Sequence, residues 1–209
     1  MNTKLVHKSE IEKGESSFAL VDSRSNPAWH SFANKVFDSD SQNVSIADIM
    51  SGAKLSNWNV RLEEVAPAFP NHNFITDSYL VVRDNPYTES ATDVLSVVGS
   101  RYKVVQNEEL FSFAENLHDG NPLVSVDSAG SLKDGRIVFG SWNLPNELVL
   151  DPQGANDKTK LYLIVWTSHD GSVAVQAAIT PVRVRCQNTL NLAMKQAKQS
   201  FKKIGRAHV

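Results

Sequence analysis

The most regular hydrophobic pattern lies near the C-terminus, where apolar residues recur at helical spacing. It predicts a helix over about residues 189–204 that carries an apolar stripe and, about 100° away, a basic stripe. The apolar stripe consists of Leu190, Met194, Ala197, Phe201 and Ile204, and the basic stripe of Lys195, Lys198, Lys202 and Arg206. We expect the apolar stripe to dock on a sheet and the basic stripe to face water or a ligand.

The rest of the chain reads as strands joined by tight turns, with two short helices. Ser45-x-x-Asp48 resembles a capping box ahead of a helix over residues 46–53, and Asn107 predicts the N-cap of a second helix. Strand patterns cover residues 58–65, 79–83, 94–98, 123–127, 136–143, 161–166, 172–179 and 181–186. Asp-Gly pairs at 134–135 and 170–171 predict turns between strands.

This order of elements predicts an α+β fold, with antiparallel β-sheets, helices packed on one side and a C-terminal amphipathic basic helix. The chain has 209 residues, of which 41% are hydrophobic and 21% charged, a composition typical of one globular domain. Residues 1–27 are predicted to be a polar N-terminal arm, and residues 28–209 a single α+β domain.

The charge is unevenly distributed along the chain. Residues 171–209 contain seven Lys and Arg residues and no Asp or Glu, so the net charge of −2 divides into −9 for residues 1–170 and +7 for the remainder. A split of this kind favours a polyanionic partner for the C-terminal part. The alternative interpretation, that the two parts attract each other, carries equal weight.

Motifs for catalysis, cofactors or metals are missing from the sequence. It contains no phosphate-binding glycine-rich loop, no nucleophile elbow and no HExxH, and its histidines lack ligand spacing. We interpret Ser168-His169-Asp170 as a turn, because the members of a catalytic triad meet in space rather than in sequence. Cys186, on the apolar side of a strand pattern, is interpreted as a core residue. We therefore predict no enzyme, no catalytic residues, no cofactor and no metal.

The compartment is predicted from what the sequence lacks. A single cysteine excludes an internal disulfide, the first 15 residues are too polar for a secretory signal, and no apolar stretch reaches the length of a membrane helix. These features predict a cytoplasmic protein without membrane association.

Four blocks of sequence together resemble the phage/plasmid-like protein family, a domain of unknown function (932). They are Trp29-His30 with Asp48-Ile49 and Trp58, the run from Val97 to Asn107, Ala129-Gly-Ser-Leu132, and Ser168-His-Asp-Gly-Ser172 leading to the run from Thr180 to Leu190. The resemblance covers about residues 28–208. It implies a protein of phage or plasmid genomes that acts in the host cell cytoplasm, and it carries over no established catalytic residues.

Two basic segments predict contacts with DNA. Arg101, Tyr102 and Lys103 combine charge with a ring that can stack on a base, although a hairpin around a core tyrosine is the alternative. The second set, expected to neutralise phosphates, consists of Arg183, Arg185, Lys195, Lys198 and Lys202.

The order of strands followed by a basic helix resembles the β-β-β-α core of single-strand annealing proteins, a likeness at the level of the fold. It suggests single-stranded DNA as the partner and a homo-oligomer, since annealing proteins commonly form rings. Two functions therefore stay open. One is a non-enzymatic DNA-binding protein of recombination or replication, and the other is a protein-binding module that modulates a host or phage complex.

Overall fold

The computed structural model describes residues 17–22, 33–38, 44–65, 77–118, 125–149, 158–184 and 187–197. The elements within these ranges are β1 (Phe18–Val21), β2 (Lys35–Phe37), α2 (Ile46–Gly52), β3 (Arg61–Glu64), β4 (Ser78–Asp84), β5 (Thr92–Gly99), α3 (Asn107–His118), β6 (Ser125–Leu132), β7 (Ile137–Val149), β8 (Lys158–Ser168), β9 (Gln176–Thr180) and α4 (Gln187–Ala197). The predicted α+β class is confirmed. No helix in the described ranges has the length and apolar character that crossing a bilayer demands.

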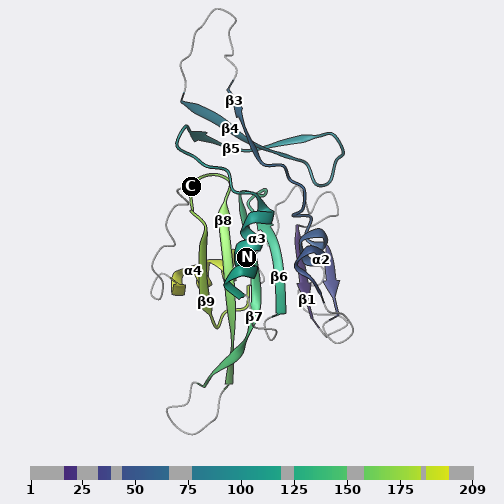
Figure 1. The fold of residues 1–209 in the computed structure, drawn as a ribbon, viewed down its shortest axis with the longest axis vertical. Coiled ribbons are helices and arrows are strands. Elements are labelled where there is room, and N and C mark those ends of the chain that lie inside the picture. Colours follow the sequence, from purple (N-terminus) through teal and green to yellow (C-terminus); the bar gives the residue numbers. More distant parts are fainter. Residues whose placement is uncertain are drawn as a thin grey trace, which may run out of the picture.

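The strands form one large and one small sheet (Figure 1). The large sheet has the order β2-β1-β6-β7-β8-β9, and the small sheet has the order β3-β4-β5. Every described pair is antiparallel except β1 and β2, which run parallel. From β6 to β9 each strand pairs with the next one in the chain, so the turns alternate between the two ends of the sheet.

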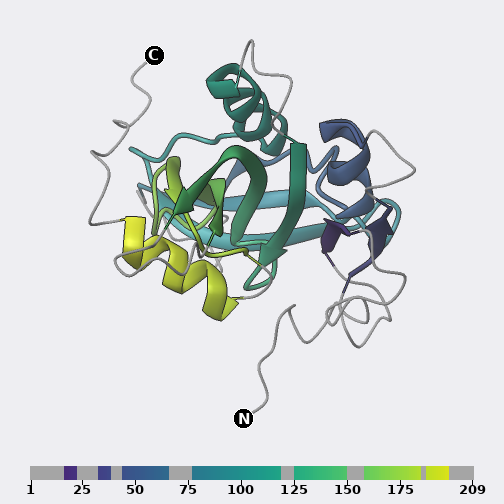
Figure 2. The same cartoon turned by 90° about the horizontal axis from the view of Figure 1, so that it is seen from below.

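Alternating side chains give the large sheet two apolar faces, as strand geometry requires. On one face, Trp142 of β7 and Val165 of β8 belong to a core shared with α2 and α3. On the other face, Phe139 and Trp166 pack with Leu190 of α4. Figure 2 shows α2 and α3 on one side of the sheet and α4 on the opposite side. The helices were expected on one side only; α4 differs because both faces of β7 and β8 are apolar and both need a cover.

Local sequence accounts for the helix starts. Ser45 and Asp48 form the expected capping box, with hydrogen bonds of 3.1 Å from the Asp48 amide to Ser45 Oγ and 3.0 Å from the Ser45 amide to Asp48 Oδ2. Asn107 is the first residue of helix α3 rather than its predicted N-cap, because its side chain bonds to Leu55 and His169 in the core. At this helix start the Gln106 amide donates to Glu109 Oε2 at 2.9 Å.

Three segments differ from the sequence prediction. Residues 18–21, assigned to the polar arm, form β1 inside the large sheet, with Phe18, Ala19 and Leu20 buried. Residues 181–184, expected to start a strand, form a loop between β9 and α4. Strand β7 continues to Val149 and β8 starts at Lys158, so both strands extend beyond the predicted ranges 136–143 and 161–166.

Candidate nucleic-acid interface

A buried imidazole lies where the two sheets meet. His169 follows β8 and is fully buried, and its Nε2 lies 3.0 Å from Oδ1 of Asn107. The Asn107 Nδ2 donates to the Leu55 carbonyl at 2.8 Å, and a carbonyl only accepts, so the amide oxygen of Asn107 faces His169. His169 Nε2 therefore carries the proton. The backbone of this residue is also held, because Ser96 Oγ donates to the His169 carbonyl at 2.8 Å.

The surroundings keep His169 neutral. Burial lowers the pKa of His169 to about 4, and the Arg83 guanidinium adds to the shift. Trp58 contacts both groups, with its ring centroid 5.8 Å from the imidazole centroid and 4.0 Å from Cζ of Arg83. The Arg83 charge is balanced by Asp93, whose Oδ2 lies 3.1 Å from Arg83 Nε. At neutral pH His169 is therefore an uncharged contact between the two sheets rather than a cation.

Three turns converge at this junction, and they comprise residues 99–103, 133–136 and 169–173. The amide of His169 donates to the carbonyl of Arg136 at 2.7 Å, which joins the second and third turns. The hydroxyl of Tyr102 donates to the Ser168 carbonyl at 3.3 Å, and the Tyr102 ring lies against Gly171, which joins the first and third. The three turns thus form one continuous surface, hereafter the three-turn surface.

Four exposed cationic side chains lie on the three-turn surface. They are Arg101, Lys103, Lys133 and Arg136. Asp134 and Asp170 belong to the same turns, so with His169 neutral the surface has a net charge of +2. Neither Arg101 nor Lys103 forms an ion pair with a residue of the described ranges. Their positive potential is therefore available to an anion.

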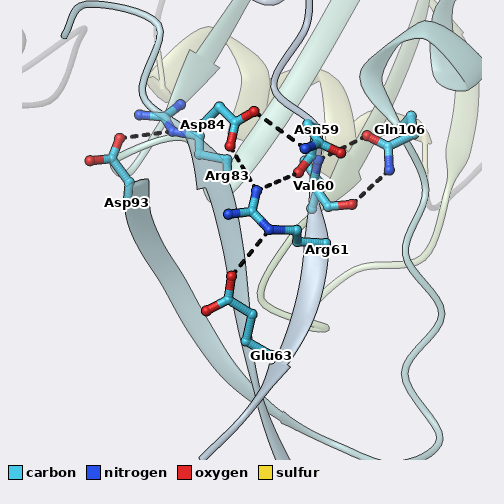
Figure 3. Close-up of polar contacts among 8 residues, drawn as sticks. All are labelled: Asn59, Val60, Arg61, Glu63, Arg83, Asp84, Asp93 and Gln106. Atoms are coloured by element: carbon cyan, nitrogen blue, oxygen red, sulfur yellow. Dashed lines mark hydrogen bonds and ion pairs between the residues drawn. The ribbon is translucent and has the colours of Figure 1, made fainter. Parts of the chain in front are cut away.

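The small sheet compensates its own charges (Figure 3). Arg61 lies 3.1 Å from Glu63 and 2.7 Å from Asp84, and its hydrogen bond lowers the pKa of the Asp84 carboxyl. The Gln106 side chain extends this sheet by accepting from the Val60 amide at 3.0 Å and donating to the Val60 carbonyl at 2.7 Å. These contacts fix the small sheet next to α3 without adding to the positive surface.

The predicted DNA-binding residues fall into three groups: those at the surface, Arg183 in an ion pair, and those outside the described residues. Arg101 and Lys103 are exposed, whereas the Tyr102 ring is half-buried against the core, and burial raises the pKa of Tyr102 to about 12, with the Asp170 charge adding to the shift. Lys195 is exposed on α4.

The guanidinium of Arg183 contacts Asp127 and Asp22, so for this residue the N-terminal and C-terminal parts of the chain do attract each other. Arg185, Lys198 and Lys202 lie outside the described residues, and so does Cys186.

The contacts around residues 168–170 are those of a turn. Ser168 Oγ donates to the Val173 carbonyl at 3.0 Å, and the His169 ring is bonded to Asn107 rather than to Ser168. Asp170 Oδ1 accepts from the Ser172 amide at 2.9 Å. In the ranges that the structure describes, no group of three or more His, Cys, Asp or Glu residues is placed to hold a metal ion.

Lys133 and Arg136 are the two members of the three-turn surface that sequence reasoning missed. Their hairpin turn was recognised from Asp134-Gly135, and so was the turn at Asp170-Gly171. In the antiparallel run β6-β7-β8-β9, the turn between β6 and β7 and the turn between β8 and β9 lie at the same end of the sheet. This rule of topology would have placed the turns at Asp134-Gly135 and Asp170-Gly171 side by side.

The part of the chain that contains Asn107, His169 and α4 matches the model of a known protein family. A family model described as Domain of unknown function (DUF932) matches residues 94–206, which is more than half of the chain. No curated protein matches the chain. No solved structure matches it either.

Proposed function

The chain belongs to the DUF932 family, and from its geometry we propose that it is a non-enzymatic DNA-binding protein that engages single strands. The observation that carries the proposal is the convergence of Arg101, Lys103, Lys133 and Arg136 on one three-turn surface. Phosphate groups are the ligands that such a group of exposed cations attracts.

The order of elements supports the choice of single strands. Strands β7, β8 and β9 run as an antiparallel meander and lead directly into α4, the order that annealing proteins share. We place the protein in phage or plasmid recombination or replication, in the cytoplasm of the host cell, as a homo-oligomer. Lys195 on α4 is proposed as a further contact with the same strand, and the sequence predicts that Lys198 and Lys202 add to it.

The test is a polarisation titration with single-stranded and double-stranded DNA over a series of salt concentrations. If four phosphates are engaged on a single strand, log Kd changes with log salt with a slope of about 3 in magnitude. The variant Arg101→Glu/Lys103→Glu is expected to weaken binding at least tenfold and to reduce that slope by about 1.4. Reversal of Lys195, Lys198 and Lys202 to Glu tests the helix in the same way.

A matched control reverses two charges elsewhere. Lys35 on β2 and Lys160 near the start of β8 are both exposed, and Lys160 lies at the end of β8 opposite to the three-turn surface. The variant Lys35→Glu/Lys160→Glu alters the net charge equally and is expected to bind as the wild type does. Equal loss in both double variants, or no salt-dependent binding by the wild type, contradicts the proposal.

A protein-binding module is the second candidate, and one observation favours it. The register shift between Val81 and Val82 changes the alternation of β5, so that Val94 and Val97 both lie on the outer face of the small sheet, 58% and 62% exposed. Partner capture that resists nuclease and high salt, and that is lost in Val94→Ser/Val97→Ser, would favour this function over DNA binding.

A further inference from the structure

The Arg183 guanidinium points at the large sheet and pairs with its carboxylates, although 31% of the side chain is still exposed. Its Nε donates to Asp127 Oδ1 at 2.8 Å and Oδ2 at 3.1 Å, and its Nη2 lies 2.5 Å from Oδ1. Nη2 also donates to the Val21 carbonyl at 2.9 Å, and Nη1 lies 3.5 Å from Asp22 Oδ2. The Asp127 side chain is 0% exposed and that of Asp22 5%, so Arg183 neutralises two carboxylates that water does not reach.

Val184, the residue after Arg183, is bonded to the same part of the large sheet. Ser128 Oγ donates to the Val184 carbonyl at 3.1 Å and lies 2.9 Å from Ser141 Oγ, which in turn contacts Asp127 Oδ2 at 3.3 Å. The Val184 side chain is buried in the core that also holds Leu190 of α4. The loop between β9 and α4 is thus bound through both a side chain and a backbone carbonyl, a few residues before the helix starts.

The electrostatics of this cluster depend on the guanidinium. Burial raises the pKa of Asp127, while its hydrogen bond with Arg183 opposes the rise. Without the cation, two buried carboxylates on β6 and just after β1 would face each other across the position that Arg183 fills. The loop would then keep only the Val184 contacts, and the sheet would keep an uncompensated charge.

We infer that Arg183 is a positioning residue that anchors α4 to the large sheet, and that it is not a phosphate ligand. The anchor holds the exposed Lys195 at a fixed position relative to the sheet. Testing this inference by DNA binding rests on the proposed function. Testing it by the hydrogen exchange of α4 does not.

The experiment compares Arg183→Gln with Lys195→Gln, which removes the same charge from an exposed position on α4. Hydrogen exchange of the α4 amides, residues 187–197, and the salt slope of single-stranded DNA binding are measured for both. In Arg183→Gln we expect exchange of the α4 amides at least tenfold faster, with an unchanged slope. In Lys195→Gln we expect unchanged exchange and a slope smaller by about 0.7.

Each outcome decides one point. Protected α4 amides together with a smaller slope in Arg183→Gln would make Arg183 a phosphate ligand and overturn the inference. A wild-type protein that does not bind DNA removes the proposed function, yet the exchange data still test the anchor. If Arg183→Gln does not fold, Arg183→Gln/Asp127→Asn also removes the uncompensated carboxylate, and α4 amides that exchange as slowly in that variant as in the wild type contradict the anchor.

Discussion

This protein has two polar clusters that each bury an ionisable group. One keeps its group neutral, and the other pairs its group with an opposite charge. At the junction of the sheets, His169 is kept neutral and its Nε2 proton is shared with an uncharged amide. On the face of the large sheet that packs against α4, the buried Asp127 is paired with Arg183, which is half-buried. The difference teaches which perturbation each cluster responds to. The neutral cluster should respond to pH, and the charged cluster should respond to the removal of one partner.

Removing Arg183 from the charged cluster should lower the free energy of unfolding more than any other change proposed below. Arg183→Met leaves the buried Asp127 without its cation, and we expect the free energy of unfolding to fall by about 3 to 5 kcal/mol, measured by urea denaturation at pH 7. The double variant Arg183→Met/Asp127→Leu removes both charges and should recover most of the loss. A single variant within about 1 kcal/mol of the wild type would show that the pair is not buried as described.

Acidification should break the neutral cluster. The folded protein holds His169 neutral down to about pH 4, whereas the unfolded chain binds a proton near the ordinary pKa of 6.5. The unfolded state therefore binds more protons between these values, and stability should fall by roughly 3 kcal/mol as the pH drops from 6.5 to 4. Urea midpoints across this range measure the loss. His169→Gln should remove this part of the pH dependence, and an identical pH profile in both proteins would contradict the neutral assignment.

Replacing the Asn107 side chain tests the hydrogen bonds of the neutral cluster directly. Asn107→Ala leaves the His169 Nε2 proton and the Leu55 carbonyl without their partner, at a cost of about 2 kcal/mol in the free energy of unfolding. Ser112→Ala, at an exposed position of the same helix, serves as the control and should change stability very little. Equal losses in the two variants would mean that the amide contributes only helix propensity.

The smallest effect on stability is expected where charges face water. Arg101→Gln/Lys103→Gln should change the free energy of unfolding by about 0.5 kcal/mol or less, because neither side chain is buried or paired within the described residues. The same variant should still weaken single-strand binding, and urea denaturation alongside the DNA titration separates the two results. A large loss of stability would show that these side chains serve the fold.

Much of the fold is predictable from the sequence because it depends on neighbours in the chain. The capping box at Ser45 and the turn at Asp134-Gly135 each follow from a few adjacent residues, and the structure confirms them. Strand β1 was missed for the opposite reason. Its four residues are too few to show a period, and its neighbour β6 begins more than a hundred positions later in the chain.

Two of the four cations of the candidate site were predicted from the sequence, but their grouping with the other two was not. Arg101 and Lys103 were identified from composition, while their grouping with Lys133 and Arg136 depends on how three turns pack. Arg183 was assigned to the solvent side because residues 181–186 alternate like a strand. The structure forms a loop there, and the guanidinium turns inward because Asp127 and Asp22 lie beneath it.

The position of β1 also sets a constraint on synthesis in the cell. Ala19 pairs with Ala129, so 110 residues must be translated between the two halves of this pairing. At about 5 to 20 residues per second, the ribosome needs roughly 6 to 22 s to deliver the second half. Throughout that interval the nascent N-terminal segment, with its apolar Phe18 and Leu20, has only β2 to pair with, and early chaperone contact would be of most use there.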